Sequence, residues 1–196
     1  MIDIRNAEIY DAWTNGARAH VELVKLPCYK DKVILKKFRK GTFRFFIKEI
    51  FVLMYLKGTK ITPKILDISF GKKILILEYM AGERLLEWAL RKCSRESVNV
   101  KDYQNIHGID TNPVIAAAFS VLQNSKDSEV VCLKKEIQKS YKKLHHYKIS
   151  QGDVRPRNLI CCGNSVALID FDHALFMLRP ARRDNVLLKK WYGICV

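Results

Sequence analysis

Three polar residues in the C-terminal part of the chain have the types and spacing of a site for a divalent cation. Asp153 and Asn158 lie five residues apart, and Asp170 follows twelve residues later. A loop that begins with Asp and ends with Asn can present both side chains to one place. A short hairpin after Asn158 would return Asp170 to the same place. Carboxylate and amide oxygens are hard ligands of the kind that Mg²⁺ prefers, so we expect Asn158 and Asp170 to bind Mg²⁺.

Asp153, the remaining residue of the three, fits a catalytic role and not a metal-binding one. Transfer of a phosphoryl group needs a carboxylate that orients the attacking hydroxyl and accepts its proton, and Asp153 fits that role. A polar loop beside an ordinary strand is the competing interpretation, and it would be the better one for any single residue of the three. The complete constellation follows a long helical pattern and is divided by a hairpin signal, which favours phosphoryl transfer.

The elements expected around these residues change in character along the chain. Periodicity and turn residues predict strands, then a helix, then strands again, over residues 19–26, 32–38, 43–57, 64–69 and 73–79. Beyond Gly82 they predict mostly helices with a small hairpin, over residues 85–90, 113–123, 128–147, 158–162, 166–171 and 182–191, and an irregular connection over 98–112. Gly163-Asn164 is the hairpin turn signal.

This order predicts an α+β fold with two lobes in a single domain over residues 1–196. The N-terminal lobe, about 1–80, would hold a small antiparallel sheet. The C-terminal lobe, about 83–196, would be a short helical one. The junction near 78–82 would be a hinge, and clefts between lobes commonly bind small ligands.

The composition and charge of the chain limit the classes of partner and the compartments that we expect. Hydrophobic residues make up 48% of the chain, and no apolar run approaches the roughly 20 residues of a membrane span. The net charge of +15 favours acidic partners, but aromatic residues do not alternate with the basic ones, so nucleic-acid binding is not required. The N-terminus does not resemble a Sec signal peptide. Six scattered cysteines without a CxxC pair fit reduced thiols in the cytosol.

The segment Gln151–Asn158, Q-G-D-V-R-P-R-N, resembles the catalytic loop of the protein-kinase-like superfamily. That loop reads H-R-D-x-x-x-x-N, or H-G-D-x-x-x-x-N in aminoglycoside and lipopolysaccharide kinases, so Gln151 replaces the usual His. Asp170-Phe171-Asp172 resembles the metal-binding D-F-G motif without its Gly. The resemblance implies ATP and Mg²⁺ as cofactors, Asp153 as the catalytic base, and metal ligation by Asp170 and the Asn of the loop.

Weaker matches follow the same order in the N-terminal half. Val33–Lys36 resembles V-A-I-K, whose Lys contacts the ATP phosphates. Lys37 competes for this role, but alternation along a strand places the two lysines on opposite faces, and the register of the motif favours Lys36. Glu49, on the following helix, resembles the Glu that pairs with this Lys. A surface charge on that helix is the alternative interpretation of Glu49.

Two further segments would complete an ATP site. Gly16 and Arg18 lie in N-G-A-R-A, a degenerate form of the glycine-rich loop that would cover the phosphates. Leu77–Met80 resembles the gatekeeper and hinge, so backbone groups of Glu78 and Met80 would bind adenine.

The resemblance implies a minimal Ser/Thr protein kinase. Only 26 residues follow Asp170, and no A-P-E motif occurs, so a protein substrate would be held in an unusual way. One group of this kind is the secreted bacterial effector kinases, including a very small family that phosphorylates a host chaperone. This implies a host chaperone as substrate and delivery by a specialised secretion system. A lipopolysaccharide or sugar kinase, a kinase of the tRNA threonylcarbamoylation type and a pseudokinase that binds a partner are the alternatives.

Overall fold

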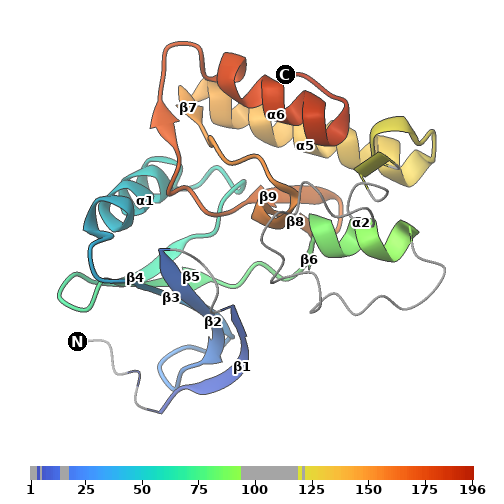
Figure 1. Cartoon of the computed structure of the whole chain (residues 1–196). Coiled ribbons are helices and arrows are strands. Elements are labelled where there is room, and N and C mark those ends of the chain that lie inside the picture. Colours follow the sequence, from blue (N-terminus) through green and yellow to red (C-terminus); the bar gives the residue numbers. More distant parts are fainter. Residues whose placement is uncertain (1–3, 5, 14–17, 94–118, 121) are drawn as a thin grey trace. The chain divides into compact units, whose positions relative to one another are not determined.

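Residues 4, 6–13, 18–93, 119–120 and 122–196 are described by the computed structural model of this α+β chain. The chain divides into two compact units, Met1–Met80 and Ala81–Val196, whose boundary falls within the junction expected from the sequence (Figure 1). The expected connection over 98–112 lies outside the described residues. Of the expected helix over 113–123, residues 119–120 and 122–123 are described, and they are helical.

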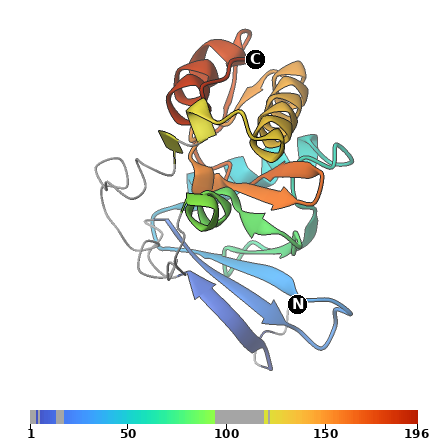
Figure 2. The ribbon, with the colours of Figure 1, turned by 90° about the vertical axis from the view of Figure 1, so that its right-hand side faces the viewer.

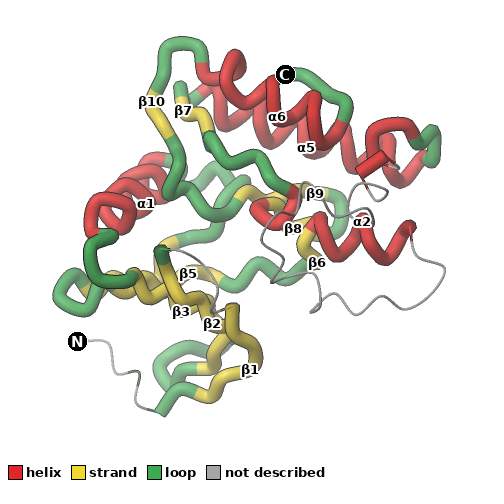
Figure 3. Tube along the Cα trace, in the orientation of Figure 1, coloured by secondary structure: helices red, strands yellow, loops and turns green. Residues whose placement is uncertain are grey.

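The first unit is built on a five-stranded antiparallel sheet, shown as yellow tubes in Figure 3. Its strands, in the spatial order β1-β2-β3-β5-β4, are β1 Glu8–Trp13, β2 Ala19–Lys25, β3 Val33–Phe38, β5 Ile74–Glu78 and β4 Ile65–Ser69. The sequence predicts four of these strands to within one residue at each end. It misses β1, an edge strand with no buried side chain, because its residues do not alternate between apolar and polar.

The two faces of this sheet bury different groups. On one face, alternating residues of β2, β3 and β5 pack into a core together with Leu26; its members are Val24, Leu26, Val33, Leu35, Ile74 and Ile76. On the other face lies helix α1, Phe43–Tyr55, whose fully buried Phe46 contacts the rings of Phe38 and Phe70 at centroid distances of 5.3 and 5.8 Å. Because Phe38 contacts Phe46 of this helix, alternation along β3 places its even-numbered residues on the same face.

The second unit is mainly helical. Its helices are α2 Leu85–Cys93, α5 Ser128–His146 and α6 Pro180–Tyr192. Its strands are β6 Glu83–Arg84, β7 Ile149–Ser150, β8 Leu159–Cys162, β9 Ser165–Leu168 and β10 Leu175–Phe176. In Figure 2, α5 and α6 lie side by side, and the β8–β9 hairpin packs beside α5. No helix in the described parts of the chain is long and apolar enough to span a bilayer.

Two short ladders fix the loops of this unit. The β8–β9 hairpin turns at Gly163-Asn164 as the sequence predicts: Cys162 pairs with Ser165, and Gly163 has a φ of 58° that suits a two-residue turn. Strand β9 ends at Leu168, three residues before the expected end. The second ladder pairs β7 with β10, so it joins the chain just before Gln151 to the chain shortly after Asp170.

Candidate functional site

Lys36 and Glu49 form a buried ion pair in the first unit. The Nζ of Lys36 lies 2.9 and 2.7 Å from the two carboxylate oxygens of Glu49, and the side chains are only 9% and 2% exposed. Lys36 lies on β3 and Glu49 on α1, so the pair joins the sheet to the helix that follows it. The pairing predicted from the sequence is therefore present, and the alternative that Glu49 is a surface charge is wrong.

Lys37, the competing lysine, faces the other side of the sheet. Its Nζ lies 2.9 Å from one carboxylate oxygen of Glu22, and the Nε2 of His20 lies 2.8 Å from the other. Burial raises the pKa of Glu22, but the hydrogen bonds from Lys37 and His20 outweigh burial and leave this pKa below its ordinary value. Lys37 is thus held by a cluster of its own, as strand alternation requires.

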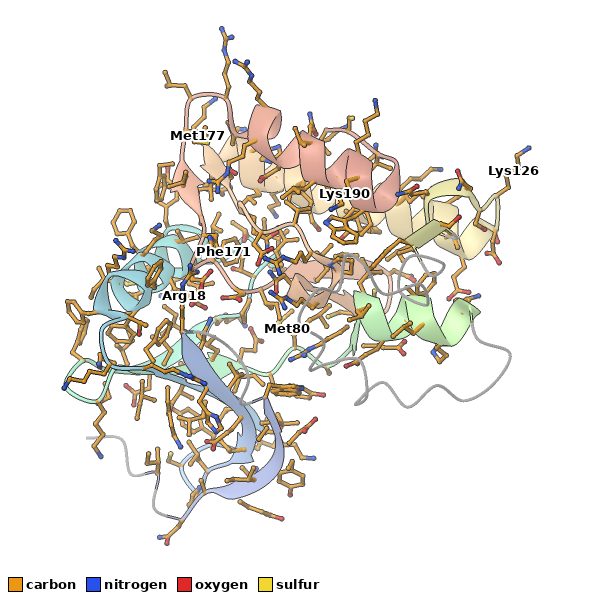
Figure 4. The ribbon with its side chains drawn as sticks, viewed as in Figure 1. Arg18, Met80, Lys126, Phe171, Met177 and Lys190 are labelled. Atoms are coloured by element: carbon orange, nitrogen blue, oxygen red, sulfur yellow. The ribbon has the colours of Figure 1, made fainter. Side chains whose placement is uncertain are left out.

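The expected phosphate-covering loop is only partly described. Gly16 lies outside the described residues. The guanidinium of Arg18 stacks on the ring of Phe45 in α1, with its carbon 4.0 Å from the ring centroid (Figure 4). The Arg18 carbonyl accepts a hydrogen bond from the backbone N–H of Arg39 at 2.9 Å. Arg18 is therefore fixed against α1 at the end of the loop.

The two residues expected at the hinge differ in what their backbones can offer to a ligand. The N–H of Glu78 donates to the carbonyl of Lys64 at 2.9 Å, so the sheet already uses the Glu78 donor. Met80 follows the last residue of β5 by two positions (Figure 4), and its backbone has no hydrogen-bond partner among the described residues. Of the two, only Met80 keeps its N–H available for a ligand.

In the second unit, Asp153 and Asn158 close one loop. The side-chain amide of Asn158 donates to the Asp153 carbonyl at 3.0 Å, across a single 3-10 turn, Pro156–Asn158. The Asp153 carboxylate accepts from the Nε of Arg155 at 2.6 Å. Asp153 and Asn158 are only 7% and 3% exposed. The five-residue spacing thus brings Asp153 and Asn158 together, with the amide oxygen of Asn158 left for another ligand.

Asp170 returns to this loop through the backbone. The N–H of Ile169 donates to the carbonyl of Asn158 at 2.9 Å, immediately before Asp170. Asp170 has a φ of 62°, in the left-handed region that few residues other than Gly adopt. Such strain costs on the order of 1–3 kcal/mol and concentrates at functional sites. The next side chain, Phe171 (Figure 4), is fully buried and anchors the segment.

Asn158 and Asp170 carry oxygen atoms of the kind that could bind Mg²⁺. No group of three or more His, Cys, Asp and Glu side chains suited to a metal is found within the described ranges. Asn158 and Asp170 would supply two oxygen ligands. Mg²⁺ is commonly held by one or two protein ligands plus substrate phosphates and water, so two ligands are sufficient for this chemistry.

Gln151 stands where the kinase loop that this segment resembles has His, and its side chain makes two hydrogen bonds. The side chain is completely buried. Its Oε1 accepts from the hydroxyl of Tyr141 on α5, and its Nε2 donates to the carbonyl of Ile169 at 2.8 Å. Burial, reinforced by the charges nearby, raises the pKa of Tyr141, so its hydroxyl stays protonated as a donor. The amide of Gln151 therefore joins α5 to the residue that precedes Asp170.

Asp184 of α6 was not predicted from the sequence as a site residue. It binds the segment Ser150–Gly152, which leads into the Asp153 loop. This fully buried carboxylate accepts from the Ser150 hydroxyl at 2.7 Å and from the N–H groups of Gln151 and Gly152, each at 3.1 Å. It also lies 2.8 Å from the Nε2 of His145. Asp184 sits at helical spacing from the buried Leu188 and Trp191. An acidic residue on the apolar stripe of a helix was the signal that could have identified it.

The turn at Gly152 permits no side chain. Its φ is 75°, and a Cβ built there would lie 2.6 Å from the carbonyl oxygen of His173. This approach keeps the Asp153 loop and the segment after Asp170 in contact.

Comparison of the chain with protein-family models and with curated proteins finds no match.

Proposed function

We propose that this protein is an ATP- and Mg²⁺-dependent phosphotransferase with a minimal, two-lobed kinase-like fold. The observation that carries the proposal is the buried Lys36–Glu49 pair. Protein kinases require an ion pair between a Lys on the third strand and a Glu on the helix that follows, and this pair occupies those positions. A buried ion pair is a weak device for stability, because hydrophobic side chains of similar volume often serve as well. A role in binding phosphate explains why the chain has charges there.

The second unit supports the same proposal with an independent set of residues. Asn158 and Asp170 would hold Mg²⁺ on the ATP phosphates, which would supply charge neutralisation as the γ-phosphoryl group is transferred. Asp153 would orient the acceptor hydroxyl and take its proton. Arg155 fixes the Asp153 carboxylate through a hydrogen bond of 2.6 Å, so the base is already oriented.

The contacts of Gln151 favour an active enzyme over a pseudokinase. The replacement of His by Gln retains a donor and an acceptor, and both are used to support the loop. We propose a protein Ser or Thr hydroxyl as the acceptor, with a host chaperone as one such substrate. A sugar hydroxyl is the alternative.

The experiment measures Mg-ATP binding by calorimetry and transfer of phosphate from γ-labelled ATP, in wild type and in two variants. Asp170→Ala should lose both Mg²⁺-dependent binding and transfer. Asp153→Asn should bind Mg-ATP within about twofold of wild type and lose transfer by about 100-fold or more, the scale of a general base. If both variants transfer phosphate at the wild-type rate, the proposed roles of these residues are wrong.

A further inference from the structure

The ring of Phe45 in α1 lies close to three cationic side chains of the first unit. The guanidinium carbon of Arg18 is 4.0 Å from the centroid of this ring. The guanidinium carbon of Arg44 and the Nζ of Lys48 are 4.7 and 6.0 Å from it, but both residues belong to α1 itself. Of these three contacts, only that of Arg18 joins the helix to the segment that precedes β2 (Figure 4).

The same stretch of α1 also holds Lys36. Glu49, the partner of Lys36 in the buried ion pair, follows Phe45 by four residues. Residues at this spacing lie on one side of a helix, about 6 Å apart along its axis. About one turn of α1 therefore contacts both Arg18 and Lys36, the two cationic residues that the resemblance to kinases assigns to the ATP phosphates.

A contact with an aromatic ring suits a guanidinium that binds phosphate. The ring attracts the face of the planar cation, whereas the N–H groups of the cation point outward from its edge. The contact with Phe45 therefore uses none of these donors. It also restricts the long side chain of Arg18 in advance, which lowers the entropy that binding would otherwise cost. Guanidinium edges match the oxygen atoms of phosphate groups in particular.

The charges around the ring indicate an anion with several negative charges. The ring attracts Arg18, Arg44 and Lys48 individually, but the three cations repel one another. The first turn of α1 contains no acidic residue. A chain of linked phosphates would relieve this repulsion more fully than a single carboxylate or a neutral ligand.

We propose that Phe45 is a positioning residue for the nucleotide phosphates: its ring holds the Arg18 guanidinium so that Arg18 and Lys36 bind the same triphosphate. The ring acts through Arg18 and not by contact with the phosphates. The assignment of the triphosphate to ATP rests on the proposed function, whereas binding of a chain of linked phosphates does not.

The test measures binding of Mg-ATP, of inorganic tripolyphosphate with Mg²⁺ and of adenosine by calorimetry. Phe45→Leu removes the ring and keeps an apolar side chain, whereas Phe45→Tyr keeps the ring. The matched control is Phe43→Leu, the same change at a half-exposed Phe of the same helix. Arg18→Met, alone and combined with Phe45→Leu, completes a double-mutant cycle.

The proposal predicts that Phe45→Leu binds Mg-ATP and tripolyphosphate about fivefold or more weakly than wild type, the scale of a cation–π contact. Phe45→Tyr and Phe43→Leu should stay within about twofold of wild type, and so should adenosine binding in every variant. In the Arg18→Met background, Phe45→Leu should cause less than about twofold further loss, because the guanidinium is already absent.

Two results of these binding measurements would overturn the proposal. The first is an equal loss of Mg-ATP binding on Phe45→Leu with and without Arg18, since the ring would then act independently of the guanidinium. The second is an equal loss of adenosine and Mg-ATP binding, which would indicate general damage to the first unit.

Transfer from γ-labelled ATP separates this inference from the proposed function. A positioning role in binding predicts a higher KM for ATP in Phe45→Leu with kcat nearly unchanged. If wild type transfers phosphate and Phe45→Leu keeps the wild-type KM for ATP, the phosphotransferase proposal stands and this inference is wrong. If tripolyphosphate binding depends on Phe45 and Arg18 but no phosphate reaches any acceptor, the phosphotransferase proposal fails and the phosphate site remains. Wild type that binds neither Mg-ATP nor tripolyphosphate would overturn both.

Discussion

Single residues at this site adopt conformations that only one or two residue types tolerate. Gly152 and Asp170 both have positive φ, at 75° and 62°, on either side of the contact between the Asp153 loop and the segment after β9. The first is a glycine that a methyl group would push against a carbonyl oxygen. The second is an Asp, the residue whose short polar side chain makes the left-handed region less costly.

Substitution of Gly152 by Ala should destabilise the protein by more than about 2 kcal/mol. The left-handed φ alone costs roughly 1–2 kcal/mol, and the contact of 2.6 Å with the His173 carbonyl adds to it. Gly163→Ala is the control, because Gly163 has a φ of 58° but nothing within 4 Å of the added Cβ. It should cost about 1 kcal/mol. Urea unfolding of the two variants measures the difference, and equal losses would show that the backbone at Gly152 can relax.

The Lys36–Glu49 pair allows function to be separated from stability. The double variant Lys36→Met with Glu49→Leu should keep or gain thermal stability, because an apolar pair of similar volume avoids the desolvation of two charges. It should nevertheless lose Mg-ATP binding. Lys37→Met, on the opposite face of β3, should leave nucleotide binding unchanged. If the double variant instead binds Mg-ATP as tightly as wild type, the pair has no part in holding phosphate.

At the scale of elements, α6 and α5 hold the loop that carries Asp153. Helix α6 contributes Asp184, whose carboxylate accepts from three donors of the segment Ser150–Gly152. Helix α5 contributes Tyr141 and Ser140, the latter through a hydrogen bond of 2.7 Å to the carbonyl of Val166. The loop is thus positioned by two helices that follow and precede it in the sequence.

Asp184→Ala should cost about 3 kcal/mol or more, because it leaves two buried N–H groups and one hydroxyl without their acceptor. Asp184→Asn keeps one acceptor oxygen and should cost less. Urea unfolding gives the free energies, and hydrogen exchange at the amides of Gln151 and Gly152 reports the local opening. Unchanged protection of these amides in Asp184→Ala would contradict the account.

The cluster around Glu22, on the face of the sheet opposite α1, should make stability depend on pH. Because the pKa of Glu22 is lower in the folded chain than its ordinary value, the pair with Lys37 stabilises the fold above that ordinary value. This stability is lost as the pH falls through the lowered folded pKa. Glu22→Gln should therefore flatten part of the acid limb of a plot of unfolding free energy against pH. An acid limb identical to that of wild type would show that Glu22 contributes nothing to it.

For the whole molecule, the sequence predicts elements better than it predicts long-range contacts. The β8–β9 hairpin and α1 follow from local turn signals and periodicity, and apart from the end of β9 their bounds agree with the structure to within two residues. Strand β1 could not be predicted, because none of its residues is buried and its main-chain pairing with β2 is a contact between segments that no local pattern specifies. Asp184 acts on a segment more than thirty residues away in the sequence, a contact that no local pattern specifies.

The same difference between local patterns and long-range contacts applies to the candidate site. Motif spacing predicted the residues of each half: Lys36 with Glu49, and Asp153 with Asn158 and Asp170. The supports of these residues, Gln151 with Tyr141 and Asp184 with its donors, became visible only in the folded chain. The arginines gathered at the start of α6, Arg179, Arg182 and Arg183, could not be predicted as a group either, because basic residues are spread along the whole sequence.

The proposed phosphotransferase activity is tested most directly by incubating the purified protein with Mg²⁺ and γ-labelled ATP, alone and with a eukaryotic cell lysate. The variants Asp170→Ala and Lys36→Met with Glu49→Leu are measured beside wild type. The proposed function predicts label on a discrete protein with wild type and none with either variant. Label that appears equally with wild type and both variants, or Mg-ATP binding by wild type that never leads to transfer to any protein or sugar acceptor, would contradict it.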